Sequence, residues 1–371
     1  MQKALKPFDK IFFSIVIILL VIGIFVFISA SFGILAKNET KFYNVIFNQL
    51  LLGLLGGIVT MYITSRIPYI FWKKYAFYFF IASLIITALV FVPNLGFKHG
   101  GARRWLSLGP ISFQPVELLK ICFIIYFAGW LSWAKNKIQD LRFGVLPLGI
   151  LLGLVAIVLF RQPDTKSFIL MSLSAIAMII MAGMRWRYIL GMALIAITVL
   201  VGLLMFKPYL KDRLMTFVDP NRDPSGSSYQ LQQSLIAIGS GGIAGRGYGQ
   251  SIQKFSYLPE PQGDSIFAVI GEEFGFVGSI IIVLLYIAFA LRGLKIAQNA
   301  PDQFGKLLVT GLVMILVIQS FLNIASITGL FPLTGVPLVF MSQGGTSLLF
   351  ALASIGIILN VSRNSKNIMV K

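Results

Sequence analysis

The sequence predicts an all-α, polytopic membrane protein, and three observations lead to this fold class. Hydrophobic residues make up 57% of the 371-residue chain, charged residues make up only 12%, and the mean hydropathy is +0.87. Soluble domains carry about 25% charged residues, so this chain has too few to cover a surface that faces water. Its apolar residues form long runs, whereas outer-membrane barrels show alternating segments of about ten residues. We therefore expect a bundle of membrane-spanning helices.

Ten apolar runs are long enough to form membrane helices, which need about 20 residues to cross the hydrocarbon core. They cover residues 11–35, 43–64, 75–93, 115–133, 144–160, 167–184, 188–206, 266–291, 307–330 and 345–361. We expect them to form one membrane domain over residues 1–371, in which segment 207–265 is a large loop between the seventh and eighth helices. The first run is too long for a cleaved signal peptide, so we take it as the first helix.

The distribution of charge predicts the orientation of this bundle. Cytoplasmic loops carry an excess of Lys and Arg, and most of the 31 such residues lie near the termini or in the short loops on the same side. We therefore expect both termini in the cytoplasm and segment 207–265 outside the cytoplasmic membrane. Of the 13 acidic residues, only Asp9, Asp140 and Asp302 lie on the cytoplasmic side, so function is expected at the outer face. Because loop charges explain the net charge of +18, we expect no nucleic-acid partner.

The chain has one cysteine, Cys122, and one histidine, His99. Cys122 lies in an apolar run and is expected in the core. A single cysteine cannot form an internal disulfide, and this composition excludes a His/Cys metal site. Only an ion that prefers carboxylates, such as Mg²⁺, remains open.

Segment 207–265 contains a predicted helix followed by many glycines. Tyr229 to Ile238 is amphipathic and is expected to form a short helix at the membrane interface. The glycine-dense stretch 239–249 follows. It would let backbone N–H groups approach a phosphate closely, or it is a flexible turn over the bundle. Arg246 and Lys254 favour the phosphate interpretation.

A second basic segment, in a predicted outer loop, contains Arg103, Arg104 and Trp105. Paired arginines suit bidentate phosphate contacts, and tryptophan is common at the membrane interface. The alternative is binding of lipid headgroups. Adjacent arginines in a short outer loop oppose the orientation rule, which favours a specific role.

Ionisable residues within the spans are costly and indicate function or a partner. Glu117 and Lys120 are three residues apart and so share one helix face; they either contact substrate or form a structural ion pair. Glu272 and Glu273 lie about two turns into a later span, and a cation on another helix is a candidate partner for one of them.

Asp264 stands where the loop enters a helix, directly after Pro259-Glu260-Pro261-Gln262-Gly263. A carboxylate at this position either caps the helix N-terminus or acts as a general base toward a substrate hydroxyl. Arginines nearby would keep it ionised.

With these residues in view, the sequence resembles the SEDS family, the FtsW, RodA and SpoVE proteins of bacterial wall synthesis, over essentially its whole length. Leu258-Pro259-Glu260-Pro261 followed by Asp264-Ser265-Ile266-Phe267 is closer to the FtsW branch than to RodA. The chain departs from the family pattern at Val116, where the family often has Ser, at Thr165-Lys166 after Gln-Pro-Asp, and at Gln262-Gly263 before Asp264. The motifs that carry the resemblance are Gly101-Ala102-Arg103-Arg104-Trp105-Leu106, Gln114-Pro115-Val116-Glu117-Leu118-Leu119-Lys120, Gln162-Pro163-Asp164, Tyr229-Gln230-Leu231-Gln232-Gln233-Ser234 with Gly239-Ser240-Gly241-Gly242, Tyr257-Leu258-Pro259-Glu260, and Pro337-Leu338 with Ser342-Gln343-Gly344-Gly345-Thr346-Ser347.

The resemblance implies ten membrane helices and a peptidoglycan glycosyltransferase that polymerises lipid II at the outer face of the membrane, for the FtsW branch at the division septum. It implies partnership with a class B penicillin-binding protein and with other divisome or elongasome membrane proteins. By the same resemblance Asp264 is the essential loop aspartate, and the substrate-binding candidates are Arg103, Arg104, Trp105, Glu117, Lys120 and Glu260.

The implied reaction is attack of an acceptor sugar hydroxyl on the donor anomeric carbon, with release of undecaprenyl diphosphate. We expect Asp264 to act as base, and Arg103, Arg104, Arg246 and Lys254 are candidates for the diphosphate. No cofactor is required by this scheme, although Mg²⁺ held mostly by substrate near Asp264 stays open. The alternatives are a lipid II flippase, a RodA-type polymerase for cell elongation and a non-catalytic division scaffold.

Overall fold

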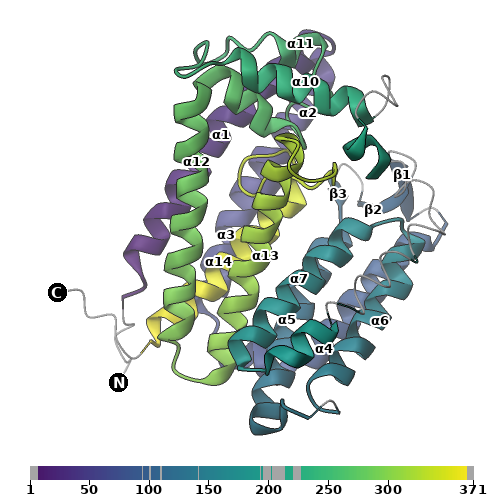
Figure 1. Ribbon diagram of the computed structural model, residues 1–371, viewed down its shortest axis with the longest axis vertical. Coiled ribbons are helices and arrows are strands. Elements are labelled where there is room, and N and C mark those ends of the chain that lie inside the picture. The colour runs from purple at the N-terminus through teal and green to yellow at the C-terminus, as the bar shows by residue number, and fades with distance from the viewer. Residues whose placement is uncertain are drawn as a thin grey trace.

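The computed structural model describes residues 7–93, 95–99, 102–108, 111–140, 142–192, 194, 202, 214–219 and 227–365. Long helices form a bundle, and a small β-sheet lies near one end of it (Figure 1). This architecture confirms the predicted polytopic helical membrane protein. The long elements are α1 (Lys10–Leu35), α2 (Glu39–Phe47) continued by the π-helix η1 (Asn48–Leu55) and by α3 (Gly56–Arg66), α4 (Tyr69–Ala88), α5 (Pro115–Ala134), α6 (Val145–Arg161), α7 (Thr165–Ala182), α12 (Ile266–Gln298), α13 (Gln303–Ile327) and α14 (Gly345–Arg363).

Within the described residues, eight helices are long and apolar enough to cross a membrane, with Glu39–Arg66 counted as one span. The shorter apolar helix α6 lies where a further span, 144–160, was expected. The span expected at 188–206 lies mostly outside the described residues. The total of ten helices therefore stays a prediction.

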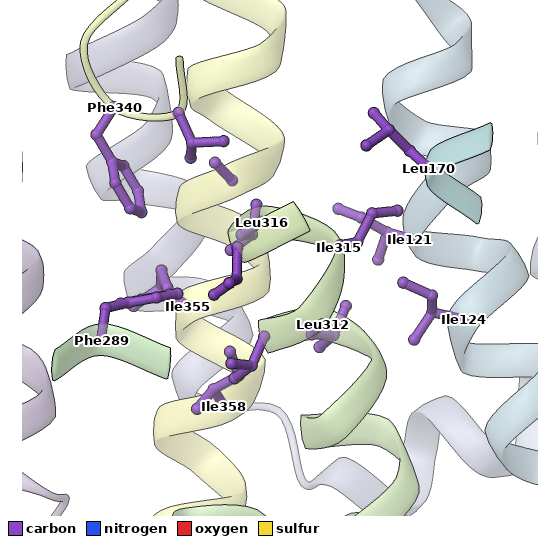
Figure 2. Packing of buried hydrophobic residues seen from close by; sticks show 14 of the residues in the cluster. Ile121, Ile124, Leu170, Phe289, Leu312, Ile315, Leu316, Phe340, Ile355 and Ile358 are labelled. Atoms are coloured by element: carbon purple, nitrogen blue, oxygen red, sulfur yellow. The ribbon is translucent and has the colours of Figure 1, made fainter. Parts of the chain in front are cut away.

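The buried core lies where α5, α12, α13 and α14 meet (Figure 2). Leu312 on α13, Ile124 on α5 and Ile358 on α14 are completely shielded from solvent. Helices α3 and α14 approach closely at Gly356, where an added Cβ would lie 2.0 Å from Thr64 Oγ1. Small residues allow such close packing in membranes, where the hydrophobic effect does not drive helices together.

Three short antiparallel strands, β1 (Gly96–His99), β2 (Ala102–Leu108) and β3 (Ile111–Phe113), form one sheet in that order. Phe97 faces Trp105 across β1 and β2, and Leu106 faces Phe113 across β2 and β3. The sequence pattern did not predict this sheet. It holds Arg103, Arg104 and Trp105 on a regular strand.

Segment 207–265 contributes α10 (Ser227–Ser240) and α11 (Gln253–Ser256). Helix α10 confirms the predicted helix over 229–238, and its Leu231 and Ala237 are buried. It packs mainly against α12. Its predicted position at the membrane interface stays a prediction.

Helix α12 is broken at Gly275, where φ is 65° and ψ is −161°. Segment 242–247 fills the break. The N–H groups of Arg246 and Gly247 donate to the carbonyls of Glu272 and Glu273, each at 3.0 Å. After the break, the N–H of Phe276 donates to the carbonyl of Gly242 at 2.9 Å. These bonds satisfy the backbone groups that a broken helix leaves unpaired, and they attach the loop to the half-helix that begins directly after Asp264.

The start of α1 and the end of α14 meet at one end of the bundle, away from α10 and α11 (Figure 1). Asp9 lies 2.9 Å from Arg292 of α12 and its N–H donates to Ser362 at 3.2 Å. The first described helix therefore begins on the side of the bundle where the last one ends, as an even number of spans requires.

Candidate functional site

A cavity of about 670 Å³ opens among the elements that carry the predicted site residues. Its lining comes from α2 and η1, from β2, from the first turn of α7, from residues 260–264 before α12, and from residues 337–347. Of the predicted residues, Arg104, Trp105, Glu260 and Asp264 line it. The structure therefore brings together residues that lie up to 160 positions apart in the sequence.

The backbone at Asp264 is held on three sides. Asn323 Nδ2 donates to the carbonyl of Asp264, and Ser342 Oγ donates to the carbonyl of Gly263, both at 2.7 Å. The N–H of Gln343 donates to the carbonyl of Gln262 at 2.7 Å. Helix α13 and the segment before α14 thus fix the position from which the Asp264 side chain reaches the cavity.

The carboxylate of Asp264 is half-buried and forms no hydrogen bond or ion pair with any described residue. The N-cap of α12 is Ser265, and no side chain caps this helix. The alternative role of Asp264 as a helix cap is therefore absent from the structure. A fixed backbone with an unengaged carboxylate suits a general base, which must be free to meet a substrate hydroxyl.

Two cations line the cavity at the turn between α6 and α7. Arg104 donates to the carbonyl of Gln162 at 3.2 Å and to that of Pro163. Lys166, in the first turn of α7, donates to the carbonyl of Gly335. Neither cation forms an ion pair with a carboxylate in the part of the chain that the structure describes, so both are available to pair with an anionic ligand.

Lys166 was missed as a site residue. The signal for it was present as the departure from the family pattern at Thr165-Lys166. Arg103, which was predicted, is exposed and is not among the residues that line the cavity.

Glu117 and Lys120 form a buried ion pair of 2.8 Å on α5. They line a separate small pocket that shares Ser347 with the main cavity. Lys120 Nζ donates to Gln319 Oε1 at 3.0 Å, and Gln319 Nε2 donates to the carbonyl of Pro337 at 3.1 Å. Because Pro337 lines the main cavity, the pair is linked to the site through Gln319 and does not itself line it.

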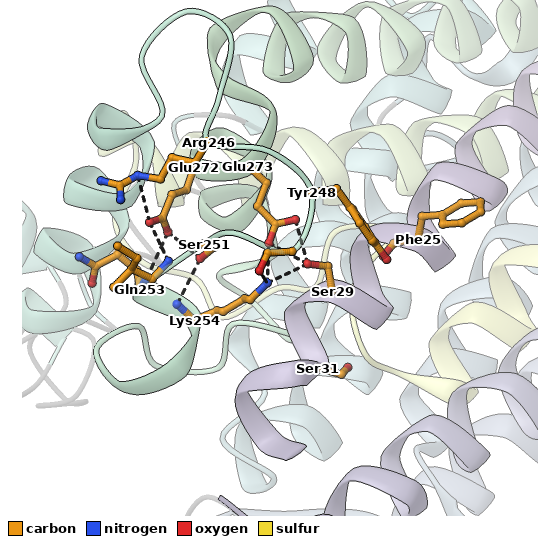
Figure 3. Close-up of polar contacts among 12 residues, drawn as sticks. Phe25, Ser29, Ser31, Arg246, Tyr248, Ser251, Gln253, Lys254, Glu272 and Glu273 are labelled. Atoms are coloured by element: carbon orange, nitrogen blue, oxygen red, sulfur yellow. Dashed lines mark hydrogen bonds and ion pairs between the residues drawn. The ribbon is translucent and has the colours of Figure 1, made fainter. Parts of the chain in front are cut away.

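Arg246 and Lys254 do not line the cavity and instead contact the glutamates of α12 (Figure 3). The Lys254 side chain is completely buried and lies 2.6 Å from Glu273 Oε1. It also donates to Ser29 Oγ on α1 at 2.9 Å. Arg246 lies 3.6 Å from Glu272 and is partly exposed. The expectation of a cation partner is met for both glutamates, and both partners come from the same loop.

Glu272 fastens α11 to α12 (Figure 3). Its carboxylate accepts from Ser251 Oγ at 2.6 Å, from the N–H of Ile252 at 3.0 Å and from the N–H of Gln253 at 3.3 Å. Tyr248 nearby donates to the carbonyl of Phe25 at 3.0 Å, and burial together with the charge of Glu273 raises the pKa of its hydroxyl.

Two glycines of the glycine-dense stretch face protein backbone. An added Cβ at Gly241 would lie 2.0 Å from the carbonyl oxygen of Gly271, and one at Gly245 would lie 2.2 Å from that of Glu273. At these two glycines the loop backbone approaches the backbone of α12 closely, whereas the prediction was close approach to a phosphate. Neither of the two interpretations of this stretch, a phosphate site or a flexible turn, describes this packing.

The carboxylates of Glu260 and Asp264 are the acidic groups among the described residues that line the cavity. No group of three metal-ligating side chains occurs in the described ranges. Because Mg²⁺ takes six oxygen ligands, an ion here would take most of them from substrate and water. Mg²⁺ held mostly by substrate near Asp264 therefore stays an open alternative.

The fold and the site together define a polytopic helical membrane protein with a polar cavity toward one end of its bundle. The chain belongs to the FTSW_RODA_SPOVE family, described as cell cycle protein, which matches residues 9–367. It is 37% identical over 361 residues to "Probable peptidoglycan glycosyltransferase FtsW" of Geobacter sp. (strain M18), covering 97% of this chain and 98% of the relative. It is also 37% identical to stage V sporulation protein E of Bacillus subtilis (strain 168), covering 96% and 98% of the two chains.

Solved structures show the same fold. A chain from a peptidoglycan synthase complex that coordinates polymerization and crosslinking matches with a TM-score of 0.79 and 26% identity, covering 96% of this chain and 98% of that chain. The rod shape determining protein RodA of Thermus thermophilus matches with a TM-score of 0.70 and 26% identity, covering 97% and 98%.

Proposed function

We propose that this chain is a peptidoglycan glycosyltransferase that polymerises lipid II into glycan strands. One observation carries the proposal: Asp264, whose carboxylate is unengaged among the described residues, lines the same cavity as Arg104 and Lys166. A base and cations in one polar cavity are what transfer of a sugar from a diphosphate requires. Relatives named as peptidoglycan glycosyltransferases match nearly the whole chain, which supports this reaction class.

The reaction joins two sugars in one displacement. The acceptor hydroxyl oxygen forms a bond to the donor anomeric carbon, and the bond from that carbon to the diphosphate oxygen breaks. Its electron pair leaves with undecaprenyl diphosphate, and the hydroxyl proton passes to the Asp264 carboxylate. Such a direct displacement inverts the configuration at the anomeric carbon.

The departing diphosphate gains negative charge, which Arg104 and Lys166 would stabilise. Glu260 stands beside Asp264 in the lining. The Glu117–Lys120 pair would act indirectly, because it does not line the cavity and is linked to it through Gln319. Arg246 and Lys254 have no part in this scheme, since both are engaged with α12.

We further propose that the cavity faces outward from the cytoplasmic membrane, with both termini in the cytoplasm, and that the protein acts at the division septum. The distribution of Lys and Arg supports this orientation, and the relatives named FtsW support the division role. A class B penicillin-binding protein is the proposed partner, supported by the match to a chain of a peptidoglycan synthase complex.

The test uses the purified full chain with lipid II, with and without the cognate transpeptidase. We expect wild type to produce glycan strands and Asp264→Asn to lose roughly 10²-fold or more in rate, the range for a missing general base. Undiminished polymerisation by a folded Asp264→Asn protein would remove this residue from the mechanism. Movement of labelled lipid II across vesicles without any polymer would instead indicate the flippase. Septation supported by Asp264→Asn in cells would indicate the scaffold.

A further inference from the structure

One wall of the cavity is a polar face of the second span, which the reaction scheme above leaves without a role. Asn38, Lys41, Asn44 and Asn48 line the cavity and follow one another at intervals of three or four residues. This spacing places them on one face of the helix. Tyr43 and Phe47, between them in sequence, are 59% and 60% exposed and lie outside the lining. The helix is therefore apolar on one side and polar toward the cavity.

The amides of this wall differ in how they are used. Gln49 accepts from the N–H of Gly344 at 2.9 Å and donates to the carbonyl of Ser342 at 3.2 Å. It joins η1 to the segment that holds Asp264 in place. By contrast, the side chains of Asn44 and Asn48 form no hydrogen bond with described residues. Asn44 is exposed and Asn48 is half-buried, and both line the cavity, so their amide groups are accessible to a ligand there.

The chemistry of these amides selects a class of ligand. A side-chain amide offers two donors and an acceptor and carries no charge, which matches the hydroxyl and acetamido groups of an N-acetylated sugar. A diphosphate only accepts and is charged, so it is better met by arginine and lysine. Of the cations that line the cavity, Arg104 and Lys166 stand on β2 and α7, whereas Lys41 stands on α2, about one turn before Asn44. Trp105 also lines the cavity and supplies a flat apolar surface with one polar tip, suited to the face of a sugar ring.

We propose that the wall formed by α2 and η1 is a saccharide subsite, in which Asn44 and Asn48 bind the N-acetylated sugars of the substrate. This inference rests on the proposed function and deepens it, because it separates the region that binds sugar from the region that binds diphosphate. Asp264 lines the same cavity as the sugar-binding and the diphosphate-binding regions. The sugar hydroxyl and the leaving group must meet in this cavity.

The experiment measures binding without turnover. The probe is a tetrasaccharide of alternating N-acetylglucosamine and N-acetylmuramic acid, free of lipid and peptide, titrated into the full chain in detergent and followed by saturation-transfer NMR. The test variant is Asn44→Leu with Asn48→Leu, and the matched control is Phe47→Leu on the other face of the same helix. Undecaprenyl diphosphate and the free stem peptide are titrated separately. Thermal unfolding checks that each variant is folded; if the double variant is not, Asn44→Ser and Asn48→Ser are used singly.

We expect the double variant to weaken tetrasaccharide binding about tenfold, because it loses the hydrogen bonds of two amides to the sugars. Binding of undecaprenyl diphosphate should be unchanged, and Phe47→Leu should bind both probes as wild type does. The proposal is overturned if wild type does not bind the tetrasaccharide or if the double variant binds it normally. It is also overturned if only diphosphate or stem-peptide binding falls. Tetrasaccharide binding that depends on these amides, in a chain that forms no polymer, would sustain the subsite and reject the proposed function.

Discussion

The Nζ atom of Lys254 lies 2.6 Å from Oε1 of Glu273, and neither side chain has any exposed surface. This ion pair joins α11 to α12 two residues before the break at Gly275. Ser29 of α1 binds the same carboxylate at 2.7 Å. Three segments far apart in sequence therefore meet at one buried charge pair.

Removing one member of this pair should destabilise the protein strongly. Lys254→Met would leave the Glu273 carboxylate buried without its cation, a change that typically costs about 3–5 kcal/mol. We expect a clear fall in the thermal unfolding temperature in detergent. The control is Arg246→Gln, because Arg246 is partly exposed and its pair with Glu272 is longer, and exposed pairs contribute about 0–1 kcal/mol. Equal losses for the two variants would contradict the central role of the Lys254–Glu273 pair.

The same pair shows what the sequence could and could not predict. Continuous apolar runs predict the membrane helices, since a span requires about 20 such residues. The place of Asp264, between a Pro-rich loop and a helix, follows from local signals. The burial of Lys254 does not, because a lysine in a polar loop is ordinarily solvated and its partner lies on another element.

The cavity wall on α2 and the sheet were missed for related reasons. The apolar run indicated a helix that begins at residue 43, which left Asn38 and Lys41 in the preceding loop. The strands β1 to β3 are short, and their stability depends on pairing with one another. Neither feature has a strong local pattern, yet both supply residues to the cavity.

Gly245 and Gly249 offer a test of the loop that fills the break in α12. Both have positive φ, 82° and 80°. An added Cβ at Gly245 would lie 2.2 Å from the carbonyl oxygen of Glu273. An added Cβ at Gly249 would have no described atom within 4 Å, apart from those of its chain neighbours. We expect Gly249→Ala to cost about 1–2 kcal/mol from backbone strain alone. Gly245→Ala should cost clearly more, measured by thermal unfolding. Similar losses would mean that the loop does not pack against α12 in this way.

Charge removal at the turn between α6 and α7 should weaken use of lipid II. Arg104→Met and Lys166→Met each remove a cation that lines the cavity, so we expect a fall in kcat/KM of roughly tenfold or more in the polymerisation assay, from lost stabilisation of the diphosphate. The control is Arg161→Met at the exposed end of α6, which does not line the cavity. If Arg161→Met loses as much activity as Lys166→Met, the effect is one of general surface charge.

Asn323 should control the rate of the chemical step without touching the substrate. Its Nδ2 donates to the carbonyls of Asp264 and Val336, both at 2.7 Å, and it does not line the cavity. In Asn323→Leu, the Asp264 backbone loses one of its anchors, and a misplacement of about 1 Å can cost 10²-fold in rate. We expect kcat to fall steeply while KM stays near the wild-type value, because the substrate-binding residues are untouched. Thr328→Val at the C-cap of the same helix is the control, since the Thr328 hydroxyl donates to the carbonyls of Ile324 and Ala325 of α13. A rise in KM with kcat preserved would show that Asn323 supports substrate binding and does not position the base.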